Sequence, residues 1–133
     1  MQAITGESIL LEHDARYLDS KDYNYSAEED GKGWIHVVIH DFLLPDAYAP
    51  RSCDLLIKLP PGYPNANPDM FWTHPDIKLI RGAWPRSAEV HEVLNGKSWQ
   101  RWSRHLTASK WRPGCDCIQT FLAAIRRELA KGV

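Results

Sequence analysis

The sequence predicts an α+β fold, an antiparallel β-meander with an amphipathic helix packed on it. Two segments rich in β-branched and aromatic residues, 34–44 and 53–59, predict adjacent strands. The helix is expected over 115–131, with Asp116 in its first turn, because apolar residues recur there at helical spacing. This apolar stripe consists of Ile118, Phe121, Leu122, Ile125 and Leu129.

Composition narrows the class of protein. The chain has 133 residues, 44% of them hydrophobic and 25% charged, so 1–133 is expected to form a single domain. The formal net charge of -1 provides no overall basic field, which argues against a nucleic-acid partner. No apolar run has the length of a membrane span and the N-terminus lacks the pattern of a secretory signal, so a cytoplasmic protein without a membrane partner is expected.

The cysteines and histidines indicate no metal centre. Three cysteines, an odd number, argue against a disulfide framework, and the pair Cys115 and Cys117 has no second pair at zinc-binding spacing. Reduced thiols, no metal and no cofactor are therefore expected. Four histidines are interpreted as scattered, two of them on the solvent face of one strand. The scattered residues are His13, His36, His40 and His91, and the pair on the strand is His36 and His40.

The first half of the chain alternates between strands and turns. Residues 9–18 fit either a short helix or an entering strand. The acidic segment 26–33 ends in two glycines that flank a lysine and predicts a hairpin turn before the strand over 34–44. A turn at 45–50 reverses the chain into the strand over 53–59, whose side chains alternate between two faces. Asp54 and Lys58 share one face, and Leu55, Ile57 and Leu59 share the other.

Prolines determine the expected structure of the middle of the chain. Four prolines within 60–68 exclude a helix or a central strand, so an extended loop is expected there. A short strand over 69–73 follows, and the chain is expected to leave the sheet at the next tripeptide, His-Pro-Asp. Residues 80–97 are expected to be loop-like, with helical content around 87–94.

Four motifs follow one another in the second half of the chain. A P-x-x-Y-P-x-x-x-P loop spans 60–68, an aromatic strand with Phe71 and Trp72 follows, and His-Pro-Asp and Trp-Arg-Pro stand at 74–76 and 111–113. This order and spacing resemble the ubiquitin-conjugating enzyme superfamily. The compact form looks most like a bacterial branch, whose members sit beside a ubiquitin-like protein and an activating enzyme in antiviral or stress operons. The resemblance implies the same fold and these two partners.

The chain departs from the superfamily at two positions. There, a nucleophilic cysteine precedes the tryptophan of W-x-P by about eight residues, and here that position is Ser103. No cysteine lies between Cys53 and Cys115. Asp76 stands where the superfamily has an asparagine that steadies the oxyanion, and a carboxylate donates a hydrogen bond only when protonated.

One hypothesis is that Ser103 accepts the ubiquitin-like C-terminus as an oxyester. A serine nucleophile needs a base within hydrogen-bond reach, and His105 or His74 is expected to supply it. Asp76 is expected to orient the imidazole of that histidine. The conjugate would then pass to an amine of a target or of the protein itself.

Arg101 and Arg104 complete this hypothesis and two alternatives stand beside it. The two guanidinium groups are expected to offer donors to the oxyanion, or to an acyl-adenylate handed over by the activating enzyme. In the first alternative a thioester forms on Cys115 or Cys117, because a helix N-terminus lowers the pKa of a thiol. In the second, the chain is a non-catalytic variant of the fold that binds a ubiquitin-like protein or a partner enzyme and transfers nothing. For the segment around Ser103 itself, the alternative to a reactive site is a surface turn whose tryptophans pack on the proline loop.

Overall fold

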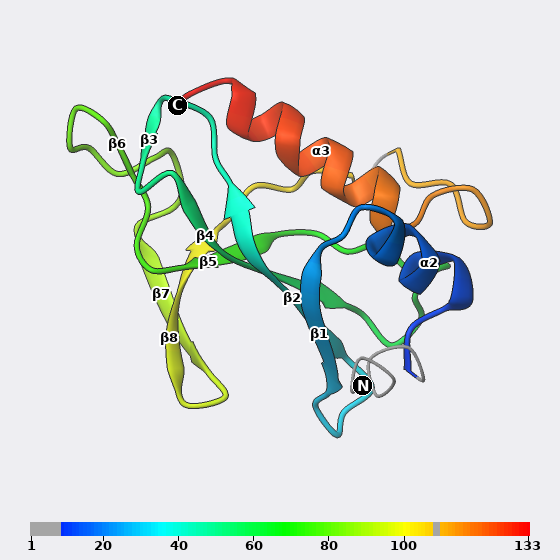
Figure 1. The fold of residues 1–133 in the computed structure, drawn as a ribbon. Coiled ribbons are helices and arrows are strands. Elements are labelled where there is room, and N and C mark those ends of the chain that lie inside the picture. The colour runs from blue at the N-terminus through cyan, green and yellow to red at the C-terminus, as the bar shows by residue number, and fades with distance from the viewer. Residues whose placement is uncertain (1–8, 108–109) are drawn as a thin grey trace.

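The computed structural model describes residues 9–107 and 110–133, which form a twisted sheet with helices against one face (Figure 1). No helix in this part of the chain is long and apolar enough to cross a membrane. The elements are α2 (Glu12–Ser20), β1 (Asn24–Glu29), β2 (Ile35–Leu43), β3 (Tyr48–Ala49), β4 (Ser52–Leu59), β5 (Phe71–His74), β6 (Lys78–Leu79), β7 (Val90–Leu94), β8 (Lys97–Trp102) and α3 (Ile118–Ala130).

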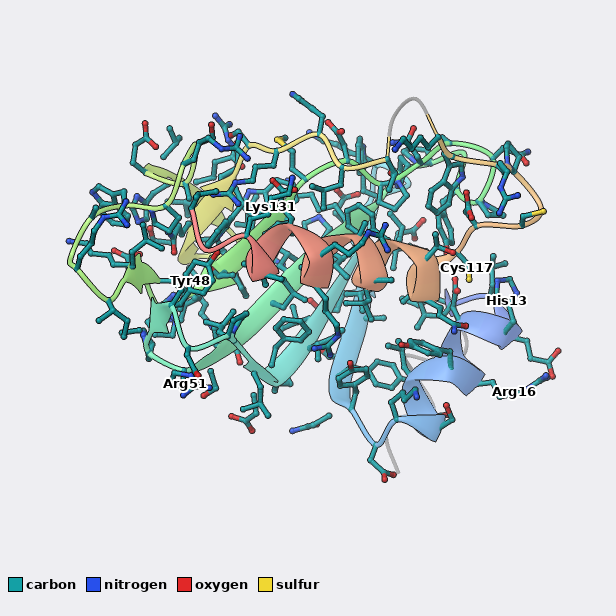
Figure 2. The ribbon with its side chains drawn as sticks, turned by 90° about the horizontal axis from the view of Figure 1, so that it is seen from above. His13, Arg16, Tyr48, Arg51, Cys117 and Lys131 are labelled. Atoms are coloured by element: carbon teal, nitrogen blue, oxygen red, sulfur yellow. The ribbon has the colours of Figure 1, made fainter. Side chains whose placement is uncertain are left out.

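Six strands form one antiparallel sheet in the order β1-β2-β4-β5-β8-β7. The first four of these make the predicted meander, and β3 and β6 pair in a separate two-stranded sheet. The helix α3 crosses one face of the large sheet, and α2 contacts it near its first turn (Figures 1 and 2). The α+β fold expected from the sequence is therefore confirmed.

The main core lies between the large sheet and α3. Side chains alternate between the two faces of β2 and β4. In the middle of each strand, every second residue is apolar, faces the helix and is fully buried. Phe121 from α3 packs among them. Asp54 and Lys58 lie on the opposite face of β4, as expected. The inward residues of the two strands are Val37, Ile39, Leu55 and Ile57.

The opposite face of the sheet carries a second, smaller apolar cluster. Its buried members are Leu56, Trp72 and Trp99, which come from β4, β5 and β8. His36 shares this face but is only 8% exposed, so the expectation that it lines a solvent face is wrong. Nε2 of this imidazole lies 3.5 Å from Oδ2 of Asp30 in the turn that precedes β2, a contact that a strand pattern alone does not indicate.

The N-terminal segment and the first hairpin differ in detail from expectation. Of the two alternatives for 9–18, the structure has the helix, α2. The range predicted for the turn, 26–33, begins too early, because its first four residues belong to β1. Asp30 forms the actual turn, since its Oδ1 accepts hydrogen bonds from the backbone N–H groups of Lys32 at 2.8 Å and Trp34 at 3.2 Å.

The proline loop contains neither helix nor strand, as its prolines predict. It does not run extended, however. The backbone N–H of Tyr63 donates to the carbonyl of Pro60 at 2.9 Å, and that of Ala66 donates to the carbonyl of Gly62 at 3.0 Å. These turns fold the loop back against α2, where the Tyr63 hydroxyl donates to Asp14 at 2.7 Å.

The helical content expected around 87–94 is wrong, because this segment contributes to a hairpin. β7 and β8 pair in antiparallel register, and Asn95 and Gly96 close the turn with φ values of 54° and 75°. Asn-Gly supplies the two left-handed residues of a tight hairpin turn, and Val90 and Val93 favour a strand. The Asn-Gly pair and the two valines thus indicate a hairpin, although the spacing of the apolar residues in 87–94 also fits a helix.

The C-terminal helix is confirmed, but it begins at Ile118 rather than at 115. Asp116 lies before the N-cap residue Cys117, and its Oδ2 accepts a hydrogen bond from the backbone N–H of Arg112 at 2.7 Å. The expectation of Asp116 in the first helical turn is therefore wrong. The carboxylate that receives the free backbone N–H of Ile118 is Asp14 of α2, at 3.2 Å.

Candidate functional site

Ser103 follows directly after β8, at the end of a strand whose last residue is rigidly held. Trp102 is fully buried, stacks on Phe71 at 5.1 Å between ring centroids, and donates its indole N–H to the Thr73 hydroxyl at 2.9 Å. The backbone N–H of Ser103 donates to the carbonyl of Ser87 at 2.9 Å. The half-buried Ser103 side chain thus leaves the sheet from a fixed position.

Arg101 donates a hydrogen bond to the Ser103 hydroxyl. The distance from Arg101 Nε to Ser103 Oγ is 2.9 Å. The guanidinium is held from its other side by Glu92, whose Oε2 lies 3.3 Å from Arg101 Nη1 and whose Oε1 accepts the Trp72 indole N–H at 2.7 Å. A cationic donor at Oγ stabilises negative charge that develops on this oxygen.

His105 is held by a carboxylate that sequence analysis missed. Its Nδ1 lies 2.7 Å from Oδ2 of Asp69, and the imidazole is 69% exposed. With Nδ1 bonded to the carboxylate, Nε2 is the nitrogen left to accept a proton. Asp69 closes the proline loop 36 positions earlier in the chain, and no local pattern connects the two residues.

Asp76 does not contact either of the histidines that it was expected to orient. Its Oδ1 lies 2.8 Å from Nε2 of His91, a histidine that was expected to be isolated. His74 directs Nδ1 to the backbone oxygen of Ser98 at 3.0 Å. β7 places His91 beside Asp76, so the carboxylate of Asp76 is bonded there. Within the described chain, the carboxylate–histidine pair near Ser103 is therefore Asp69 with His105.

A cavity of about 600 Å³ brings Ser103 and His105 together with Arg104. It lies between the segment after β8 and the C-terminal half of α3, the helix that Figure 2 shows from above. Arg101 reaches this site through its bond to Ser103, whereas His74 and Asp76 are not among the residues that line it. Three of the six predicted site residues therefore line the cavity, a fourth is bonded to one of them, and two lie elsewhere.

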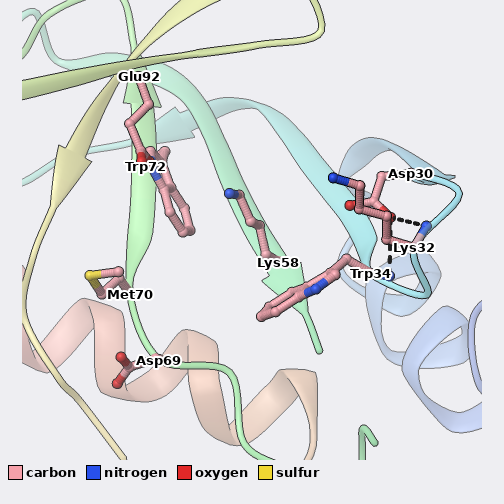
Figure 3. Close-up of a pocket in the computed structure, with 8 residues that line it drawn as sticks. All are labelled: Asp30, Lys32, Trp34, Lys58, Asp69, Met70, Trp72 and Glu92. Carbon is pink, nitrogen blue, oxygen red and sulfur yellow. Dashed lines mark hydrogen bonds between the residues drawn. The ribbon is translucent and has the colours of Figure 1, made fainter. Parts of the chain in front are cut away.

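A second cavity of about 320 Å³ lies on the outer face of the sheet (Figure 3). Lys58 lies between the indole rings of Trp34 and Trp72 in this view, with its ammonium 4.3 Å from the centroid of Trp72. Asp69 and Glu92 also line it. These two carboxylates hold His105 and Arg101, so the outer cavity is connected to the site of Ser103 through two hydrogen-bonded pairs.

The three cysteines lie away from this site. Burial, followed by the charge of Asp54, raises the pKa of Cys53 to about 12, which makes its thiol inert at neutral pH. Cys115 is exposed and Cys117 caps α3, and neither lines the cavity at Ser103.

One group of possible metal ligands exists among the described residues, although the sequence predicted none. His13, Asp14 and Cys117 present ligand atoms within 4.8 Å of one another. Figure 2 shows His13 and Cys117 at the same end of α3. Both carboxylate oxygens of Asp14 already accept hydrogen bonds from within the fold, from Ile118 and Tyr63.

The model of one protein family, described as Prokaryotic E2 family E, matches residues 10–132 of the chain. No curated protein matches the chain, and no solved structure matches it either. The matched range includes the proline loop, the sheet, Ser103 and nearly all of the C-terminal segment.

Proposed function

Because the chain belongs to prokaryotic E2 family E, and is thus a bacterial relative of the ubiquitin-conjugating enzymes, we propose that it accepts the C-terminus of a ubiquitin-like protein as an oxyester on Ser103. An activating enzyme supplies the acyl group and an amine removes it. The observation that carries this proposal is that Ser103 and His105 line one cavity, with Arg101 bonded to the serine and Asp69 to the histidine.

The chemistry requires removal of a proton from Ser103 as its Oγ attacks the acyl carbon. Nε2 of His105 accepts this proton, and Asp69 stabilises the imidazolium that forms. Arg101 stabilises the charge on the oxygen atoms at the acyl centre. Ser103 and His105 do not hydrogen-bond to each other among the described contacts, and such contacts commonly tighten only when the substrate binds.

The remaining sequence-predicted residues take different parts in this proposal. Arg104 lines the same cavity as Ser103 and His105. Asp76 and His74 receive no direct role at Ser103, because each is bonded elsewhere, to His91 and to the backbone of Ser98. An amide donor such as the superfamily's asparagine is replaced by the cationic donor Arg101.

The proposed partners are an activating enzyme and a ubiquitin-like protein encoded beside this chain. We propose that they act together in a bacterial operon for antiviral defence or stress response, in the cytoplasm. Family membership supports the general class of partner.

The test is intact-mass analysis after incubation with the activating enzyme, the ubiquitin-like protein and ATP. An adduct that resists thiol and breaks in mild base is expected with the native chain, and Ser103→Ala should abolish it. Ser98→Ala, at an exposed serine on β8, the strand that precedes Ser103, is the matched control and should keep the adduct. An adduct that survives in Ser103→Ala would contradict the proposal, and an adduct lost to thiol would transfer the chemistry to Cys115 or Cys117.

A further inference from the structure

The cavity beside Ser103 concentrates positive charge on a chain whose formal net charge is -1. Five cationic side chains face a single carboxylate, Glu128, across its walls. Such an excess of one sign in a concave, partly buried site attracts an anion of opposite charge. The cationic residues are Arg86, Arg104, Lys110, Arg127 and Lys131.

Arg104 is the buried member of this set and its hydrogen bonding is incomplete. Its side chain is 2% exposed and lies over the Trp102 ring at 5.0 Å. Nε donates to the carbonyl of Arg86 at 2.9 Å and Nη2 donates to the backbone oxygen of Val133, but Nη1 has no hydrogen-bond partner among the described residues. A buried guanidinium donor without an acceptor lowers the stability of the folded state, and an acceptor that binds there removes this penalty.

Burial, followed by the charge of Arg86, lowers the pKa of Arg104, yet a guanidinium keeps its proton throughout the physiological range. The unused donor on Nη1 therefore remains cationic. Oε1 of Glu128 lies 3.6 Å from Nη1, which is too far for a hydrogen bond.

Glu128 is already shared among other cations. Its oxygens lie 2.9 Å from Arg86 and 3.0 Å from Lys131. Burial alone would raise the pKa of this carboxyl, but the hydrogen bond and charge of Lys131, with Arg104 and Arg86, lower it, so Glu128 is ionised. Arg127 and Lys110 have no ion pair among the described residues. Their positive charges in the cavity are therefore not compensated by a carboxylate.

A phosphate group fits these donors better than a carboxylate does. Phosphate presents several oxygens at tetrahedral angles and carries more negative charge, which suits guanidinium and ammonium groups that converge from several elements. No aromatic ring other than the imidazole of His105 lines the cavity in the described chain, and its apolar walls are Leu106 and Ala124. Recognition therefore rests on the phosphate and not on stacking of a base.

We propose that this cavity is a phosphate-binding site and that the donor which acylates Ser103 is an acyl-adenylate. This inference rests on the proposed function of Ser103. In the reaction, Oγ of Ser103 forms a bond to the acyl carbon, the bond from that carbon to the phosphate oxygen breaks, and AMP leaves with the electron pair. The serine proton passes to Nε2 of His105, and Arg104 with its neighbouring cations holds the phosphate of the leaving AMP.

The first experiment measures binding without any acyl transfer. AMP and inorganic phosphate should both bind the native chain in calorimetric titrations, whereas adenosine should not. Arg127→Glu, an exposed change on α3, should weaken AMP binding about tenfold or more. Arg51→Glu changes the charge equally at an exposed arginine outside the cavity and should leave the affinity unchanged. Failure of AMP and phosphate to bind, or equal affinity in the two variants, would overturn the phosphate site.

The second experiment separates this inference from the proposed function. Glycyl-adenylate and a glycyl thioester are offered to the native chain and to Arg127→Glu, and the acylated residue is located by peptide mass analysis. The native chain should be acylated on Ser103 faster by the adenylate, and Arg127→Glu should lose that preference while it keeps its reaction with the thioester.

Equal rates from both donors, unaffected by Arg127→Glu, would overturn the adenylate donor and leave Ser103 as an acceptor. Binding of AMP without acylation of Ser103 by either donor would overturn the proposed function and the donor assignment, and leave the phosphate site alone.

Discussion

The candidate site depends on a few charged pairs, each of which joins two different segments of the fold. Arg101 is two residues from Ser103, but its guanidinium is oriented by Glu92 on the neighbouring strand. His105 is likewise oriented by Asp69, which lies between the proline loop and β5. The reactive groups are close in sequence, and the groups that orient them are not.

Asp69→Asn tests the orienting role of Asp69. An amide keeps the shape of the side chain but cannot stabilise an imidazolium, so the rate of adduct formation on Ser103 is expected to fall about tenfold or more. Rapid-mixing measurements with intact-mass detection check this. Asp76→Asn is the control, because Asp76 contacts His91 rather than His105. Equal rates for native chain and Asp69→Asn would remove Asp69 from the proposal.

His36 gives the protein a pH-dependent stability. Burial, followed by the charge of Lys58, lowers its pKa below the ordinary value of 6.5, although Asp30 acts in the opposite direction. The unfolded chain therefore binds a proton more readily than the folded one, so this contribution is complete above pH 6.5 and is lost as the pH falls toward the lower folded pKa.

His36→Gln should accordingly flatten the fall in stability between about pH 7.5 and about pH 5.5. Urea unfolding at both pH values measures this. His13→Gln, at an exposed imidazole, is the control and should leave the pH dependence as it is. An unchanged slope in His36→Gln would show that another group is responsible.

At the scale of elements, the hairpin of β7 and β8 carries Ser103, and a buried amide attaches the preceding segment to it. Gln100 Oε1 accepts hydrogen bonds from the Thr73 hydroxyl at 3.0 Å and the Ile77 backbone N–H at 2.7 Å. Its Nε2 donates to the carbonyls of Ile77 and Ala88, each at 2.9 Å. One fully buried side chain thus fixes the path of the chain between the His-Pro-Asp tripeptide and β7.

Gln100→Leu should lower the free energy of unfolding by about 3 kcal/mol, because it leaves several buried backbone groups without partners. It should also slow adduct formation, since Ser87, which bonds the backbone of Ser103, is next to the detached Ala88. Chemical denaturation and adduct kinetics measure the two effects. Gln119→Leu, an exposed change of the same type on α3, should show neither.

The elements also show how far sequence analysis reached. The strands over 34–44 and 53–59 and the C-terminal helix follow from local periodicity, which one or two buried faces impose on consecutive residues. The edge hairpin of β7 and β8 was missed, because its outer strand is largely exposed and its pattern resembles that of an amphipathic helix. The Asn-Gly turn was the better guide there.

At the scale of the whole molecule, Asp14 joins three separate parts of the chain. Its carboxylate, fully buried on α2, accepts the Tyr63 hydroxyl from the proline loop and the first free N–H of α3. Burial, followed by this hydrogen bond, raises the pKa of Tyr63, so the phenol stays protonated and remains a donor. Contacts of this kind hold the helices and the loop on the sheet.

Asp14→Asn should therefore lower the free energy of unfolding by about 2 kcal/mol, since hydrogen bonds to a charged acceptor are stronger than those to an amide. Thermal and urea unfolding check this. Asp46→Asn, at an exposed ion pair with Arg51, should change stability by about 0.5 kcal/mol or less. A loss of similar size in both variants would assign Asp14 no special part.

Four features can be derived without the structure: the α+β class, the two central strands, the C-terminal helix and the serine at the position of the superfamily's nucleophile. These depend on neighbours in the chain or on spacing between motifs, and both are readable along one dimension. Three features follow only from the folded chain: His105 pairs with Asp69, Asp76 pairs with His91, and Arg104 lines a basic cavity with a donor that has no partner among the described residues. Side-chain pairs that join distant segments depend on strand register and on the path of the loops, and neither is determined by neighbouring residues in the sequence.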